Sequence, residues 1–292
     1  MRIASWSWGG RPQVGIISAD GREATPLAAP RPERGAFELV RALAHGDALP
    51  PAAGARLPVE SITLRAPLRP RRNLFCIGRN YRAHAEELST TVFRDAVAQS
   101  RERELWPIVF TKVPETVVGP HDVVRLPGKA ITEQVDYECE LAVIIGRSGI
   151  NIPRSRAMEH VFGYTIVNDV SARDVQTRHQ QWHLGKSFDT FCPMGPWIVT
   201  ADELDGTATR IRGHVNGELR QDANTRDMIF DIPAQIEAIS RGITLYPGDI
   251  IATGSPSGVG MGFSPPRWLR HGDVVRAEVD GLGFIENRFE DR

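Results

Sequence analysis

Short apolar segments separated by glycine and proline predict a fold built mainly of β-strands. Alternating or continuous apolar runs, which are typical of strands, recur from residue 73 onward. They lie at 73–78, 107–112, 137–146, 163–169, 196–200, 209–217, 249–254 and 273–281. Helical periodicity is rarer and occurs at 36–46, 84–106, 154–163 and 231–242. The last helix pattern has Asp231 as its N-cap, Pro233 in its first turn and Gly242 at its end, which are typical helix boundaries.

The first seventy residues differ in pattern from the rest of the chain. Residues 1–18 read as strand, Gly-Gly turn, strand, and a short helix pattern and Pro/Ala/Arg-rich stretches follow. We therefore expect a small N-terminal α/β domain over residues 1–70 and a catalytic domain over residues 71–292. Within the larger domain, the charged segment 86–107 is the least patterned and is expected to be a surface excursion or a lid.

Charge and cysteine content narrow the class of protein. The 35 Lys and Arg and the 36 Asp and Glu residues are interspersed, and the formal net charge is −1, which argues against a nucleic-acid partner. The longest aliphatic run, 141–145, is far shorter than the roughly 20 residues of a membrane span, and no export signal is visible. Three cysteines without C-x-x-C spacing indicate neither a disulfide framework nor a zinc cluster. These features predict a cytoplasmic protein that binds no membrane.

The strand pattern at 135–146 combines an apolar face with an acidic one. In an extended chain Asp136, Glu138 and Glu140 share one face, and the apolar residues that alternate with them share the other. Like charges about 7 Å apart repel unless a cation lies between them. Asp169, at the end of another strand pattern, could complete a site whose oxygen donors suit Mg²⁺, Mn²⁺ or Ca²⁺. The alternatives are a solvated acidic face and a structural acid cluster.

Three further motifs have both a chemical and an ordinary reading. His84 and Glu87 are three residues apart, so on a helix the carboxylate could orient the imidazole for acid–base work; a capping or surface role is the alternative. Lys186, in a stretch rich in glycine and phenylalanine, could face an anionic site, or it could be a solvated surface charge. The Gly/Ser-rich segment 247–262 could offer N–H groups to an anion, or it could be a plain tight turn.

Six ordered motifs resemble those of the fumarylacetoacetate hydrolase superfamily. They are "FCIGRNYRAHAEE", "VDYECELAVIIGR", "GYTIVNDVSARDVQ", "GKSFDTFCPMGPWIVT", "VNGELRQDANTRDMIF" and "LYPGDIIATGSPSGVGMG", and they run from about Leu74 to Asn287. The resemblance implies an α+β, predominantly β fold, a mixed β-sandwich roll or barrel, with a small N-terminal domain. It also implies a homodimer or a dimer of dimers.

The resemblance assigns roles to individual residues. It implies that Mg²⁺ or Mn²⁺ is held by Glu138, Glu140 and Asp169. It implies catalytic roles for His84, Glu87 and Lys186. Substrate contacts are implied for Arg79, Tyr81, Arg173, Gln176 and Ser255. Ser255 stands where the family more often has threonine, so the hydroxyl is kept and the methyl is lost.

A hard cation with open coordination positions suits a 2-oxo acid as the substrate. We expect a metal-dependent hydrolase that cleaves a C–C bond in acylpyruvates or other 2,4-dioxo acids through a chelated enolate. In this scheme His84, oriented by Glu87, activates water, and Lys186 stabilises the developing negative charge. Oxaloacetate decarboxylation, hydroxymuconate-type isomerisation or decarboxylation, 2-oxo-alkenoate hydration and sugar-acid cleavage remain alternatives within the family. From another class, the alternative is a catalytically inactive binding protein of the same fold.

Overall fold

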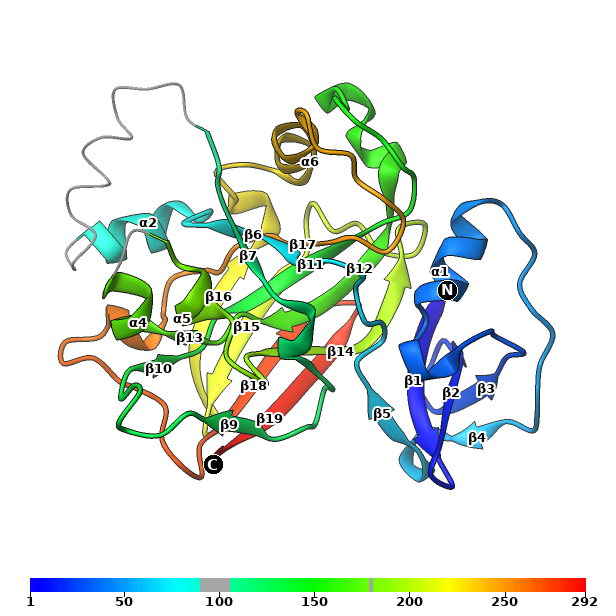
Figure 1. Cartoon of the computed structure of the whole chain (residues 1–292), viewed down its shortest axis with the longest axis horizontal. Helices are drawn as coiled ribbons and strands as arrows, with labels where there is room; N and C mark the ends of the chain where they lie inside the picture. The colour runs from blue at the N-terminus through cyan, green and yellow to red at the C-terminus, as the bar shows by residue number, and fades with distance from the viewer. Residues whose placement is uncertain (90–105, 179–180) are drawn as a thin grey trace.

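The computed structural model describes residues 1–89, 106–178 and 181–292 as a strand-rich fold with few helices (Figure 1). The N-terminal elements are β1 (Arg2–Trp8), β2 (Arg11–Ile17), β3 (Glu23–Pro26), α1 (Phe37–Ala44), β4 (Leu57–Pro58) and β5 (Thr63–Arg65). The remaining strands are β6 (Leu74–Gly78), β7 (Ile108–Lys112), β8 (Val117–Val118), β9 (Val124–Leu126), β10 (Val135–Asp136), β11 (Cys139–Ile145), β12 (Val161–Asn168), β13 (Ser171–Ala172), β14 (Cys192–Thr200), β15 (Arg210–Val215), β16 (Glu218–Asn224), β17 (Ile250–Ala252), β18 (Val274–Val279) and β19 (Gly283–Asp291). The remaining α-helices are α2 (Arg82–Ser89), α4 (Arg173–Arg178), α5 (His183–Lys186) and α6 (Ile232–Ser240). The 3₁₀ turns are η1 (Pro32–Arg34), η2 (Val59–Ser61), η3 (Pro114–Thr116), η4 (Arg154–His160), η5 (Thr225–Asp227) and η6 (Gly260–Gly262).

The strands of the described chain form one large mixed sheet and two smaller ones. The large sheet runs in the order β4-β3-β2-β1-β14-β12-β11-β17-β6-β7. A second sheet has the order β16-β15-β18-β19-β9, and β10 pairs with β13 alone. Strand β11 therefore lies well inside the large sheet, paired with β12 on one side and β17 on the other. This central place explains why its residues are buried on both faces.

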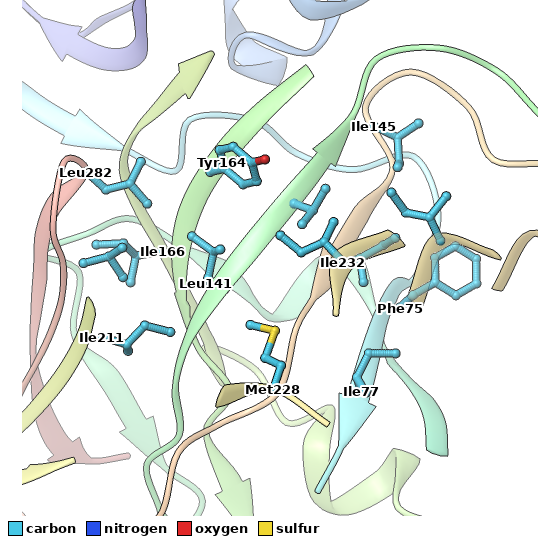
Figure 2. Packing of buried hydrophobic residues seen from close by; sticks show 14 of the residues in the cluster. Phe75, Ile77, Leu141, Ile145, Tyr164, Ile166, Ile211, Met228, Ile232 and Leu282 are labelled. Carbon is cyan, nitrogen blue, oxygen red and sulfur yellow. The ribbon is translucent and has the colours of Figure 1, made fainter. Parts of the chain in front are cut away.

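The two faces of β11 pack into different cores. Cys139, Leu141, Val143 and Ile145 belong to one hydrophobic cluster, part of which is drawn in Figure 2. Leu141 lies there among side chains from the second sheet and from α6, such as Ile211 and Ile232. Ala142 and Ile144, which alternate with these residues, belong to a second cluster on the opposite face. The apolar face expected from the sequence is confirmed for Cys139 to Ile145, and pairing on both sides of the strand positions the acidic residues at its start.

The N-terminal strands continue the large sheet. Strand β1 pairs with β14, with Arg2 opposite Val199 and Ile3 opposite Ile198. Figure 1 shows β1 to β4 on the side of the molecule away from α2 and α4. The Gly-Gly hairpin between β1 and β2 is present as expected. The division into domains at residues 1–70 and 71–292 stays a prediction.

One element prediction was wrong, two long strands were not predicted, and one prediction lies mostly outside the described residues. The pattern at 154–163 forms the 3₁₀ turn η4 and then the start of β12, because the β-branched and aromatic residues after His160 pair with β11 and β14. Strands β16 and β19 were not expected, since their many charged residues hide the alternation. Of the expected helix at 84–106 and the expected lid at 86–107, residues 90–105 lie outside the described residues.

None of the helices in the described part of the chain is long and apolar enough to cross a membrane. The cysteines are free and buried, as the sequence indicated: Cys76, Cys139 and Cys192.

Candidate active site and metal centre

Antiparallel pairing of β11 with β12 brings three acidic residues together. Cys139 lies opposite Asn168 in this pair, and the Asp169 N–H donates to the Glu138 carbonyl oxygen at 2.8 Å. The start of β11 and the end of β12 therefore meet at one edge. One carboxylate oxygen from each of Glu138, Glu140 and Asp169 lies within 4.8 Å of the other two, and the three residues are buried.

Three cations neutralise most of this charge. The Lys186 ammonium donates to Glu138 Oε2 at 2.7 Å and to Asp169 Oδ2 at 2.6 Å. The other Asp169 oxygen accepts a hydrogen bond from Lys112 Nζ at 2.6 Å, and Glu138 Oε1 lies 2.7 Å from Arg173 Nη2. Burial alone would raise the pKa of Glu138, but Lys186 and Arg173 hold this pKa below its usual range. Glu138 is therefore ionised at neutral pH.

Glu140 is placed differently from the other two acids. The Gly254 N–H donates to Glu140 Oε2 at 2.9 Å, and within the described residues no cationic side chain pairs with this carboxylate. Burial raises the pKa of Glu140 well above its usual range, and the charges of Asp169 and Glu138 raise it further. Added positive charge beside Glu140 would relieve this repulsion.

The donor set fits a hard divalent cation. Oxygens on opposite sides of a Mg²⁺ ion are about 4.2 Å apart and those around Ca²⁺ about 4.8 Å apart, which is comparable with the 4.8 Å within which the three carboxylates fall. A bound cation would also supply the charge that Glu140 lacks. Glu138, Glu140 and Asp169 are therefore a possible metal-binding triad.

The raised pKa of Glu140 predicts a pH dependence of stability in chelator-treated protein. Because the folded-state pKa exceeds the unfolded-state value, the carboxyl is protonated in both states at low pH, and stability is lost as the pH rises from the unfolded-state pKa to the folded-state pKa. Each pKa unit of difference lowers the free energy of unfolding by about 1.4 kcal/mol. Urea unfolding in EDTA between about pH 5 and pH 8 measures this slope. Glu140→Gln should flatten the slope, and equal slopes in the two proteins would contradict the assignment.

Asp136 does not join the triad, although the extended pattern placed it on the same face. It ends β10, which pairs with β13 rather than continuing into β11, so the chain bends between Asp136 and Cys139. Its Oδ2 accepts a hydrogen bond from Arg173 Nε at 2.8 Å. Its other oxygen accepts hydrogen bonds from the N–H groups of Tyr137 and Gly260, at 2.9 and 2.7 Å. The prediction of a three-acid face on one continuous strand was therefore wrong for this residue.

His84 and Glu87 form the hydrogen-bonded pair that their spacing indicated. Both lie on α2, with His84 Nδ1 3.0 Å from Glu87 Oε2. Because a carboxylate only accepts, Nδ1 carries the hydrogen and Nε2 is left as the basic nitrogen. The Gly258 N–H donates to Glu87 Oε1 at 3.0 Å. The Gly-rich loop therefore binds the Glu87 oxygen other than the one that contacts His84.

One pocket gathers most of the residues that the resemblance singled out. It has a volume of about 320 Å³ with its open mouth included. The expected site residues that line it are Arg79, His84, Glu138, Arg173, Gln176, Lys186 and Ser255. Tyr81 is not brought to this pocket. It is buried in the hydrophobic core and lines a neighbouring groove with Arg82 and Asp227.

Residues 73–290 match the family model described as fumarylacetoacetate (FAA) hydrolase C-terminal. The chain belongs to the fumarylacetoacetate hydrolase family. The oxaloacetate tautomerase YisK of Bacillus subtilis (strain 168) is 48% identical over 232 residues, which are 79% of this chain and 74% of that protein. The solved structure of a fumarylacetoacetate hydrolase from psychrophilic Exiguobacterium antarcticum is 37% identical, with a TM-score of 0.84 and full coverage of both chains. A 5-carboxymethyl-2-hydroxymuconate delta-isomerase structure from Mycobacterium smegmatis is 33% identical, with a TM-score of 0.80 over both full chains. The expected family and fold class are confirmed.

Within this fumarylacetoacetate hydrolase fold, sequence reasoning missed Lys112. The residue is 1% exposed at the end of β7, and besides Asp169 it donates to the Val170 carbonyl oxygen at 3.0 Å. A lysine that ends an apolar strand was the available signal, because lysine is rarely buried without a charged partner.

The aromatic wall of the pocket was also missed. Phe110 and Trp182 line it with ring centroids 5.3 Å apart, and the Lys186 ammonium lies 4.9 Å from the Phe110 ring centroid. Nothing in the spacing of these aromatic residues marks them as neighbours. The same wall explains Gly78, where an added Cβ would lie 2.5 Å from the Trp182 ring.

Proposed function

We propose that the protein catalyses keto–enol tautomerisation of a 2-oxo dicarboxylic acid, with oxaloacetate as the leading candidate. The observation that carries the proposal is the pocket itself, where His84 and Lys186 line the same space as Glu138 of the acidic triad. A tautomerase needs a base for the C3 proton and a cationic environment for the oxygen that gains charge. The name of the Bacillus subtilis relative supports this choice of reaction.

The chain's own residues supply the proton transfers. His84 Nε2 takes a proton from C3, the C–H electron pair becomes the C2=C3 double bond, and the carbonyl electron pair moves onto the keto oxygen. Burial lowers the pKa of Lys186, but Asp169 and Glu138 raise it more, so its net shift is upward. The protonated ammonium can therefore give a proton to this oxygen, which completes the enol, and Lys186 regains a proton from solvent as the His84 imidazolium releases the one taken from C3. A divalent cation on the triad would act as a Lewis acid toward the 2-oxo acid.

Two arginines suit the carboxylates of such a substrate. Arg173 is fixed between Asp136 and Glu138 and lines the pocket. Arg79 lines the same pocket, and its Cζ lies 5.8 Å from the centre of the Trp182 ring. We assign Arg79 to the second carboxylate of the substrate, because a guanidinium binds carboxylates in a bidentate manner.

The test is an assay of the ketonisation of enol-oxaloacetate in the presence of Mg²⁺ or Mn²⁺. The reaction is measured as the loss of absorbance of the enol. We expect an acceleration of about a hundredfold or more over buffer with the same metal. A coupled assay for pyruvate in the same cuvette separates decarboxylation from tautomerisation. An unchanged rate of enol loss would contradict the proposal.

Hydrolysis of acylpyruvates or other 2,4-dioxo acids is the second candidate. It is favoured by the name of the Exiguobacterium antarcticum structure, which resembles this chain over its full length. In that reaction His84 would activate water rather than remove a C3 proton. A panel of acylpyruvates, assayed for acid release beside oxaloacetate, distinguishes the two reactions.

The assembly, the metal and the compartment are also proposals. We propose Mg²⁺ or Mn²⁺ as the native ion, a homodimer or dimer of dimers, and a cytoplasmic location. Light scattering after gel filtration tests the oligomeric state, and metal analysis of protein purified without chelator tests the ion.

A further inference from the structure

The Gly-rich loop between β17 and the end of η6 binds the protein's own carboxylates. Along this loop the N–H groups of Gly254, Gly258 and Gly260 donate to Glu140, Glu87 and Asp136, respectively. The next N–H, that of Met261, donates to Asp136 Oδ2 at 3.0 Å. The anion-binding character indicated by the sequence is thus directed at three side chains of the site. The loop connects the acidic triad, the His–Glu pair and the Asp136–Arg173 pair.

The loop packs so closely against its neighbours that Gly260 and Gly262 leave no room for a side chain. A Cβ on Gly262 would lie 2.0 Å from Glu87 Oε1. A Cβ on Gly260 would lie 2.7 Å from Asp136 Oδ1 and 2.2 Å from the Arg267 carbonyl oxygen. Gly258 has φ +100°, a conformation that glycine adopts without strain. The positions of Glu87, Asp136 and the loop therefore depend directly on one another.

Two residues adjacent in sequence, Asp136 and Tyr137, form hydrogen bonds with the loop. Tyr137 donates its hydroxyl hydrogen to the Gly258 carbonyl oxygen at 2.6 Å, on the same residue whose N–H binds Glu87. Asp136 is 0% exposed, and each of its oxygens accepts a hydrogen bond both from the loop and from outside it. The same carboxylate thus fixes both the loop and the Arg173 guanidinium.

We infer that Asp136 and Tyr137 are positioning residues that set the loop, and through Gly258 set the orientation of Glu87 and His84. Asp136 also sets Arg173 in the pocket, whereas Tyr137 does not. The kinetic part of this inference rests on the proposed function. The two residues should therefore differ in their effects: Tyr137 acts on turnover, and Asp136 acts on turnover and on substrate affinity.

Tyr137→Phe is the main test because it removes one hydroxyl and keeps the ring. Amide hydrogen exchange at 258–262 should become about fivefold to tenfold faster, and kcat should fall by a similar factor with KM unchanged. Asp136→Asn should lower kcat further and raise KM. Matched controls are Tyr164→Phe, a buried tyrosine in the main core, and Asp174→Asn, whose carboxylate binds Thr132; both should leave loop exchange and kcat unchanged.

A double-variant cycle shows whether the effect runs through Glu87. In a Glu87→Gln background, Tyr137→Phe should cost little further kcat, because the hydrogen bond that it supports is already weakened. If the effects of the two substitutions on kcat were fully additive, the inference would be overturned. It would also be overturned if the amides of residues 258–262 exchanged at the wild-type rate in Tyr137→Phe. If the wild type turns over none of the oxo acids, the proposed function fails. In that case, amide exchange in the loop and Mn²⁺ titration of the variants still test whether Asp136 and Tyr137 position the loop. Faster exchange in a variant whose Mn²⁺ affinity stays within about twofold of wild type supports this role.

Discussion

Glu140→Gln should abolish turnover and remove high-affinity metal binding while the protein remains folded. Glu140 is the triad member that the cationic side chains of the described residues leave unpaired, so its charge depends most on an added cation. Even outer-shell changes cost about tenfold to a hundredfold in metal affinity, so loss of this ligand should cost about a hundredfold or more. Turnover should fall by about a thousandfold or more, the range expected when a Lewis acid is lost.

Calorimetric titration with Mn²⁺ and the enol-oxaloacetate assay measure these two losses. Glu133→Gln is the matched control, because Glu133 is exposed and close in sequence but outside the triad. The chelator-treated Glu140→Gln protein should be at least as stable as chelator-treated wild type at neutral pH, since a neutral amide relieves the repulsion from Asp169 and Glu138. Wild-type turnover or metal affinity in this variant would refute the metal site.

His84→Ala should lower kcat by about a hundredfold or more while metal affinity stays within about twofold, because the loss is that of a general base. His84 does not belong to the triad, yet it lines the same pocket with its Nδ1 held by Glu87. Its removal therefore affects proton transfer rather than the carboxylates. Enol-oxaloacetate kinetics and Mn²⁺ titration of the same preparation separate the two effects.

The companion variant Glu87→Gln tests whether the pair works as a unit. An amide keeps the shape of Glu87 but removes the negative charge that strengthens its hydrogen bond with His84 Nδ1–H. It should lower kcat less than His84→Ala does, and the double variant should be no slower than His84→Ala alone. Retained turnover in His84→Ala would mean that another group, such as Lys186, moves the C3 proton.

Much of the fold and of the triad could be predicted because the signals are local. The alternation at 137–146 marked a strand with one apolar face, and the structure confirms it as the buried strand β11. Glu138 and Glu140, two residues apart, and Asp169, at the end of the next strand, could be named as possible ligands from these short patterns. The three-residue spacing of His84 and Glu87 similarly indicated a contact within one helix.

The partners of these residues could not be predicted in this way. Lys112 and Asp169 are 57 residues apart in sequence, and Asp136 and Gly260 are 124 apart. The short periodicities of strands and helices carry no information about contacts between residues so far apart in sequence. The error over Asp136 had the same origin: the backbone bends after β10 and directs this acid to Arg173 and the Gly-rich loop.

The amino-acid sequence by itself determined which groups are available: oxygen donors on buried strands, an imidazole one turn from a carboxylate, and a loop rich in glycine. These follow from residue identity and from the two- and three-residue spacings of strands and helices. Only the tertiary structure decided that Lys112, Lys186 and Arg173 pair with two of the three acids, and that no cation of the described segments pairs with Glu140. The physical reason is that charge pairing in a buried site depends on distances of a few ångströms between segments far apart in the chain, and packing sets those distances.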